Sequence, residues 1–174
     1  ASQEHSLLDL LFTVESHWET MEFEINIHKE MYILGDTEEI VTQLEDDIIT
    51  ISTILSSTFV TAIKPQVEKW EHDLRLMYET IEQWVNCQQK WMYLENVFSA
   101  PDIASQLEEE NKLFKTVNRF FKDTMKRTNE NRNVFNACTQ NIGLFEKFKS
   151  HNLHLAKIDK ALEAYLERKR NDFP

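Results

Sequence analysis

Glycine is nearly missing from this 174-residue chain, which contains only two glycines, together with three prolines and two cysteines. A phosphate-binding loop needs several glycines within a few residues, but Gly35 and Gly143 stand far apart in the chain. The repeated tight hairpins of a β-sandwich would also need more glycine than is present. The scarcity therefore excludes glycine-rich nucleotide loops and β-sandwiches, and it favours a protein of long helices.

Cysteine pairs and long apolar runs are also missing. Cys87 and Cys138 are isolated and lack C-x-x-C spacing, so we expect no disulfide framework and a reducing, intracellular compartment. No stretch approaches the roughly 18 consecutive apolar residues of a membrane span. The first residues, Ala1 to Glu4, lack the basic and apolar regions of a signal peptide. We therefore expect a cytoplasmic protein with no membrane partner.

Basic residues are nearly missing from the first third of the chain. The formal net charge is −11, from 30 acidic and 19 basic residues. Residues 1–63 hold thirteen acids and one base, Lys29, which leaves 17 acids and 18 bases for residues 64–174. Nucleic-acid affinity depends mainly on positive charge near the phosphates, so a nucleic-acid partner is not expected.

Apolar side chains recur with the helical period over most of the sequence. This pattern predicts helices over about 3–21, 37–59, 65–98, 107–126 and 142–170, and a short segment that starts near Val134. Between the first two helices, Phe23, Ile25 and Ile27 alternate with polar residues as in a half-buried strand. The predicted fold is mainly α: an elongated bundle of about five to six helices, one about 34 residues long, with a small β-hairpin near residues 22–34.

The longest predicted helix carries an apolar stripe with a mean spacing of about 3.4 residues, close to the heptad period. A helix of that length would extend about 50 Å. We expect the structural core to contain the four tryptophans and two further large side chains, namely Trp18, Trp70, Trp84, Trp91, Leu94 and Phe98. On the 37–59 helix, Thr37 is the expected N-cap, and Glu45, Asp46 and Asp47 are expected to face solvent.

No residue pattern indicates catalysis or metal binding. A di-iron bundle needs Glu three residues before His on two helices, and none of the six histidines has it. His151 and His154 are correctly spaced to share a helix face, but two ligands do not make a site. Cys87 lies in the apolar stripe, and Cys138 has no base near it in sequence. We therefore expect no catalytic residue, no metal and no cofactor in this segment.

One charge pattern allows two interpretations. Basic residues recur at steps of three and four over the 107–126 helix, opposite its apolar positions: Lys112, Lys115, Arg119, Lys122 and Lys126. The commoner explanation for such a pattern is a solvated helix face. The alternative is a docking stripe for an acidic surface, which would act mainly on encounter and orientation.

Four motifs, in the same order, resemble segments of the dynein heavy chain linker. Residues 84–98, WVNCQQKWMYLENVF, resemble its W-x-x-x-Q-x-x-W-x-Y-L-E-x-I-F segment, and residues 99–107 resemble the adjoining segment of axonemal members. Residues 162–174, LEAYLERKRNDFP, resemble its Y-L-E-x-K-R-x-x-F-P, and residues 35–46 are similar to its upstream glycine, E-I and L-E-D positions. Two departures are Glu108, where proline is usual, and Phe120-Phe121, where tryptophan is common.

The resemblance implies that residues 1–174 are a single fragment of the linker domain, with an acidic helix-hairpin-helix part over 1–63 and a long helix and C-terminal helices over 64–174. In that family the linker is a lever that swings over a ring of AAA+ modules during ATP hydrolysis, with the ATP sites outside it. The implied partners are the ring and the remaining linker of the same heavy chain, together with other dynein subunits. The implied location is the cytoskeleton, in the axoneme of a cilium or flagellum.

A different class of function is the alternative hypothesis. A spectrin-like helical scaffold could bind another protein through the acidic first third. That hypothesis predicts three helices of similar length and no hairpin near residues 23–34.

Overall fold

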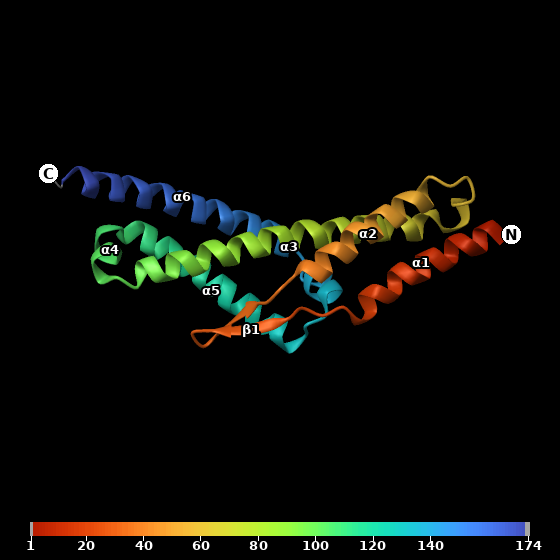
Figure 1. The fold of residues 1–174 in the computed structure, drawn as a ribbon, viewed down its shortest axis with the longest axis horizontal. Coiled ribbons are helices and arrows are strands. Elements are labelled where there is room, and N and C mark those ends of the chain that lie inside the picture. Colours follow the sequence, from red (N-terminus) through yellow and green to blue (C-terminus); the bar gives the residue numbers. More distant parts are fainter. Residues whose placement is uncertain (1, 173–174) are drawn as a thin grey trace.

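One long helix organises the elongated molecule (Figure 1). The computed structural model describes residues 2–172, so Phe173 and Pro174 of the last motif lie outside the described residues. Helix α3, Lys64–Phe98, has 35 residues, which corresponds to about 52 Å at 1.5 Å per residue. The prediction of one helix about 34 residues long is confirmed.

Shorter helices pack along the two halves of α3 (Figure 1). Helix α2, Glu38–Leu55, packs along its first half, and α1, Ser2–Thr20, packs against α2. Helices α5, Glu108–Glu130, and α6, Leu144–Asn171, lie beside its second half. As a result the two ends of the chain lie at opposite ends of the molecule.

Three short elements connect these helices, and two predicted boundaries were wrong. The connections are a 3-10 turn (η1, Thr61–Ile63), a short helix (α4, Pro101–Gln106) and a π-helical turn (η2, Asn136–Gln140). Helix α2 ends at Leu55 rather than near residue 59, and α5 continues to Glu130 rather than ending near residue 126. The mainly α fold with a small hairpin is confirmed.

The hairpin consists of β1, Ile25–His28, and β2, Met31–Leu34, paired antiparallel. Its two loop residues, Lys29 and Glu30, have φ values of 48° and 69°, the left-handed conformation that two-residue hairpin loops require. Ile27 is 73% exposed, so the expected alternation of buried residues does not extend along β1. The hairpin and the unequal helix lengths contradict the spectrin-like arrangement.

The start of α2 also differs from the prediction. Thr37 occupies the N-cap position, but its side chain makes no capping hydrogen bond. Instead the carboxylate Oδ1 of Asp36 accepts a hydrogen bond from the backbone N–H of Glu38, at 2.9 Å. An acceptor one residue earlier therefore satisfies one of the free N–H groups at the helix start.

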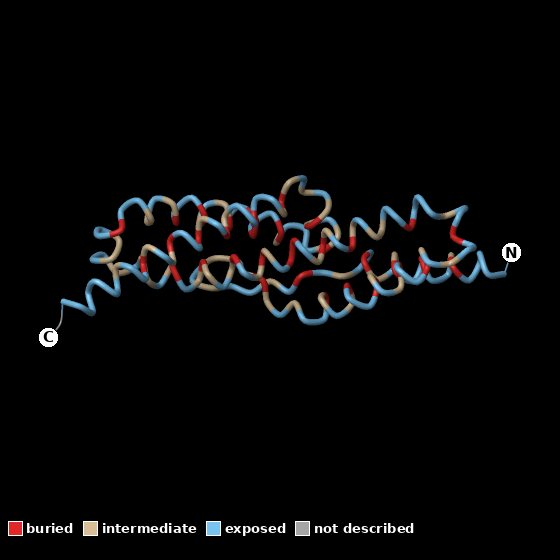
Figure 2. Tube along the Cα trace, turned by 90° about the horizontal axis from the view of Figure 1, so that it is seen from above, coloured by how far each residue is buried: buried red, intermediate tan, exposed pale blue. Residues whose placement is uncertain are grey.

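Buried residues form a band along the axis between the helices (Figure 2). At the centre of this band, the Trp84 ring lies 5.0 Å from Phe23 and 5.0 Å from Phe148, measured between ring centroids. Phe120 packs edge-on against Phe148 at 5.0 Å. These four rings form an aromatic column that joins the segment before the hairpin to α3, α6 and α5.

The six residues expected in the core differ in burial. Trp18, Trp84, Trp91 and Leu94 are buried, whereas Trp70 and Phe98 are half-buried at the margin of the core. Each of these two still packs against another aromatic ring: Trp70 against Phe135 and Phe98 against Phe114, both at 5.3 Å. Both lie toward the ends of α3.

We predict that Trp91→Ala lowers the free energy of unfolding by about 3–5 kcal/mol, because it leaves a large cavity beside the stacked ring of Phe121. Chemical denaturation measures this loss. Tyr93→Ala is the matched control, since Tyr93 is 55% exposed two residues away, and its effect should stay within about 0.5 kcal/mol. A loss below about 1 kcal/mol for Trp91→Ala would contradict its place in the core.

Candidate functional site

All four tryptophans tie one helix to another through the indole N–H. Each donates it to an acceptor on a neighbouring helix: Trp18 to Asp47 Oδ2 (2.9 Å), Trp70 to Glu15 Oε2 (3.2 Å), Trp84 to Met125 Sδ (3.3 Å) and Trp91 to Asn118 Oδ1 (2.7 Å). The pairs connect α1 with α2, α1 with α3, and α3 with α5. At each junction, one tryptophan therefore supplies both a large packed ring and a hydrogen bond that orients the two helices.

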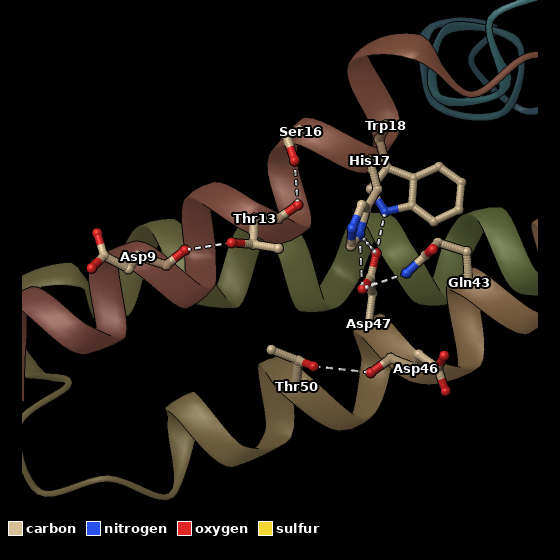
Figure 3. A network of polar contacts seen from close by, with 9 residues as sticks. All are labelled: Asp9, Thr13, Ser16, His17, Trp18, Gln43, Asp46, Asp47 and Thr50. Atoms are coloured by element: carbon tan, nitrogen blue, oxygen red, sulfur yellow. Dashed lines mark hydrogen bonds and ion pairs between the residues drawn. The ribbon is translucent and has the colours of Figure 1, made fainter.

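The buried carboxylate of Asp47 is the centre of the α1–α2 junction (Figure 3). It accepts hydrogen bonds from the indole N–H of Trp18 at 2.9 Å and from Nε2 of Gln43 at 3.1 Å. Nδ1 of His17, which is about one-third exposed, lies 2.9 Å from Oδ2 of the same carboxylate. A buried carboxylate is costly unless such partners surround it, and Asp47 has three.

The expectation that Asp47 faces solvent was wrong, because the residue is only 2% exposed. Its neighbours Glu45 and Asp46 are exposed, as expected. The helical spacing does place position 47 on the buried face of α2, since it follows the buried Leu44 by three residues and precedes the buried Ile51 by four. Two of its three polar partners, His17 and Trp18, come from α1 and could not be inferred from α2 alone.

The 84–98 motif attaches the hairpin to α3. Its residues 84, 88, 91 and 95 share one helix face, at steps of four, three and four. The side-chain amide of Gln88 forms the pair of hydrogen bonds that the backbone of a neighbouring strand would form. Its Oε1 accepts from the backbone N–H of Leu34 at 2.8 Å, and its Nε2 donates to the carbonyl of Leu34 at 2.9 Å. The Trp91 ring contacts the His28 ring edge-on at 6.2 Å.

Glu95 completes this attachment at the hairpin loop. Its Oε1 lies 3.5 Å from Nε2 of His28 and 3.4 Å from Nζ of Lys29. The same Lys29 ammonium donates a hydrogen bond to Oδ1 of Asn96 at 2.8 Å. The loop residue Lys29 is thus held by two residues of α3. The 84–98 motif therefore docks the hairpin onto α3.

The five basic residues of the predicted stripe lie on the exposed side of α5, and none of them forms an ion pair within residues 2–172. The opposite side of α5 is buried and carries Phe114, Val117, Phe121 and Met125. At the hairpin end, Lys122 and Lys126 line a hollow of about 200 Å³ together with Tyr32 of β2 and the acidic residues Glu30 and Glu130. The structure therefore places the whole stripe on one accessible surface.

The two cysteines and the His151–His154 pair contribute to packing. Burial raises the pKa of Cys87 to about 12 and also raises the pKa of Cys138, so both are neutral thiols at pH 7. Burial, and then the charge of His154, lowers the pKa of His151. The His151 ring stacks on Phe120 at 4.3 Å and meets His154 edge-on at 5.5 Å.

Metal-binding clusters and membrane-spanning helices are both missing from the described part of the chain. Among residues 2–172, no group of three or more His, Cys, Asp or Glu side chains is arranged to hold a metal ion. Within the same residues, no helix combines the length and apolar character needed to cross a membrane.

Sequence comparison gives a consistent set of relatives. Residues 1–174 match the family described as "Dynein heavy chain, N-terminal region 2". Over its whole length, the chain is 42% identical to dynein axonemal heavy chain 6 of Homo sapiens and 38% identical to dynein axonemal heavy chain 12 of Rattus norvegicus. It is 35% identical to the dynein-1-beta heavy chain, flagellar inner arm I1 complex, of Chlamydomonas reinhardtii. The chain covers 4%, 6% and 4% of these relatives, respectively.

We predict that Asp47→Ala lowers the free energy of unfolding by about 2–3 kcal/mol, since it leaves the buried indole N–H of Trp18 without an acceptor. Asp46→Ala removes the same charge from the exposed neighbouring position and should change stability by no more than about 0.5 kcal/mol. Urea denaturation of both variants provides the measurement. Equal effects would show that the Asp47 network does not stabilise the α1–α2 junction.

Proposed function

The chain belongs to the dynein heavy chain family, and we propose that it is a stiff length of the linker that transmits ATP-driven changes of the AAA+ ring in microtubule-based movement. The observation that carries this proposal is helix α3, which runs unbroken for 35 residues with other helices packed along both of its halves. The relatives are about 17 to 25 times longer than this segment, as coverage of 4–6% implies. The catalytic sites of the motor would then lie in other parts of the heavy chain.

A lever transmits force only if it resists bending, and a single helix does so poorly. Helix α2 supports the first half of α3, and α5 and α6 support the second half. Trp84 lies on α3 where α2 is replaced by α5 and α6 as the supporting helices. Its ring contacts both Phe23 and Phe148. The hairpin, docked by Gln88, packs against both α3 and α5 in the same region. The two halves therefore overlap, which opposes a hinge between them.

The names of the relatives suggest where the protein works. Heavy chains 6 and 12 are described as axonemal, and the relative from Chlamydomonas reinhardtii is described as part of a flagellar inner arm complex. On that basis our proposal extends to the cytoskeleton of cilia or flagella as the location. The proposed partners are the ring and the remaining linker of the same heavy chain, and other dynein subunits.

The basic stripe of α5 is proposed to orient the lever relative to the AAA+ ring. Five exposed cations on one helix face, without ion-pair partners in the described residues, favour an acidic surface opposite them. Exposed charges of this kind affect encounter and alignment more than affinity, and their effect falls as salt increases. The proposed opposing surface is an acidic face of the AAA+ ring in the same heavy chain.

The lever is tested in the intact motor with Gln88→Ala/Glu95→Ala, which releases the hairpin without emptying the core. We expect ATP hydrolysis to remain within about twofold of the parent while microtubule gliding slows several-fold, because transmission and not chemistry is impaired. Glu163→Ala, on an exposed position of α6, is the control. Unchanged gliding, with hydrogen exchange showing that residues 25–34 have been released, would contradict the proposed role of this segment.

The stripe is tested separately by reversing three of its charges, Lys115→Glu/Arg119→Glu/Lys122→Glu, in the same motor. We expect docking between linker and ring, measured by energy transfer between fluorophores placed on each, to weaken at low salt. The difference from the parent should shrink as salt rises from about 50 to 500 mM, because screening removes the charge contribution. Equal docking at low salt would leave the stripe as a solvated helix face.

A further inference from the structure

A second accessible surface lies on the other half of the molecule, between α2 and α3. Two adjoining hollows of about 570 and 260 Å³ follow the line where these helices pack. They share Tyr78 and Glu82, so they form one continuous groove. On α2 the groove extends from Thr37 to Ile49, which is about 18 Å, or roughly three helical turns.

The floor of the groove is apolar. Val41 and Ile48 of α2 and Tyr78 and Val85 of α3 line it, and all four side chains are only partly buried by the fold. Ile49 stands at one edge and is 65% exposed. A contiguous apolar strip that stays open to solvent is typical of an interaction surface, whereas isolated exposed apolar residues are not.

The rim of the groove is acidic. Glu45, Glu79 and Glu82 line it, against one basic residue, Arg75. None of these three carboxylates has an ion-pair partner within 4 Å in the part of the chain that the structure describes. Helix α2 adds to the effect, because four of its five acidic residues are exposed and it carries no Lys or Arg. The charge around the groove is therefore uncompensated and attracts a cationic ligand.

These features together define the occupant. We propose that the groove binds an amphipathic helix of about three turns, with an apolar stripe and Lys or Arg on its flanks, contributed by another part of the same heavy chain. The groove between two packed helices is the shape that a third helix fills, with its apolar residues at i, i+3, i+4 and i+7. The relatives are far longer than this chain, so the proposed source of the helix is a segment of the same heavy chain outside residues 1–174. The proposal does not depend on the lever function.

Binding is tested with a labelled 14-residue probe peptide that has leucine at those positions and lysine at the flanking ones. Fluorescence anisotropy against the 174-residue chain should show saturable binding, and a peptide with glutamate in place of lysine should bind at least about tenfold more weakly. Glu45→Lys/Glu82→Lys should weaken binding of the lysine peptide to a similar extent. The control Glu146→Lys/Glu163→Lys, which makes the same charge change on exposed sites of α6, should leave binding unchanged.

A second variant separates the apolar floor from charge attraction. Ile49→Asn replaces an apolar side chain with an uncharged polar one at an exposed site, so it should not disturb folding, but it should reduce binding of the lysine peptide several-fold at high salt as well as low. Equal binding by both peptides, or equal loss with both Glu→Lys pairs, would overturn the proposal. Circular dichroism melts confirm that each variant is folded.

The source of the helix is tested in the full heavy chain. A photo-crosslinking residue at position 49 should produce a crosslink within the same chain, to a helical segment that contains both apolar and basic residues. Crosslinking to a separate subunit, or no crosslink from position 49, would overturn the assignment to the same heavy chain.

Discussion

Aromatic packing around Trp84 is the interaction on which the rest of the structure depends. This ring lies where the first and second halves of the molecule overlap, and it contacts Phe23, Phe148 and Met125, which belong to three other segments. Because large aromatic side chains bury more area per residue than any others, one such contact holds several helices at once. Without it, α3 would lose its lateral support at mid-length.

Polar contacts then decide how the packed helices are oriented. Burial alone is non-directional, but a buried N–H or carboxylate must find its partner or destabilise the fold. Asp47 therefore fixes α1 against α2, and Gln88 fixes the end of β2 against α3. The conspicuous residues of the 84–98 motif are explained in the same way, since Gln88, Trp91 and Glu95 on one face of α3 contact the hairpin. The exposed surfaces that remain are opposite in character: a basic face on α5 and an apolar groove with an acidic rim between α2 and α3.

Local patterns predicted much of this fold because helix and strand periods are local properties. The spacing of apolar residues located all the long helices, and the alternation before Ile27 located the hairpin. Asp47 was misplaced because its burial depends on Trp18 and His17, which lie nearly thirty residues away in the sequence. Trp70 was expected in the core but lies half-buried at its margin, because periodicity says which face is apolar and not how many neighbours cover it. The α2–α3 groove could not be predicted from helix periodicity, because its two walls belong to different helices.

The sequence by itself determined that the chain is helical, that one helix is very long, and that its motifs are those of dynein heavy chains. These properties depend on residue types at short spacings, which the linear sequence contains directly. Only the tertiary structure decided which charged residues are buried, which aromatic rings meet, and which apolar residues remain open to a partner. Those outcomes depend on contacts between segments far apart in the chain, since burial is a property of the neighbours that a residue acquires on folding.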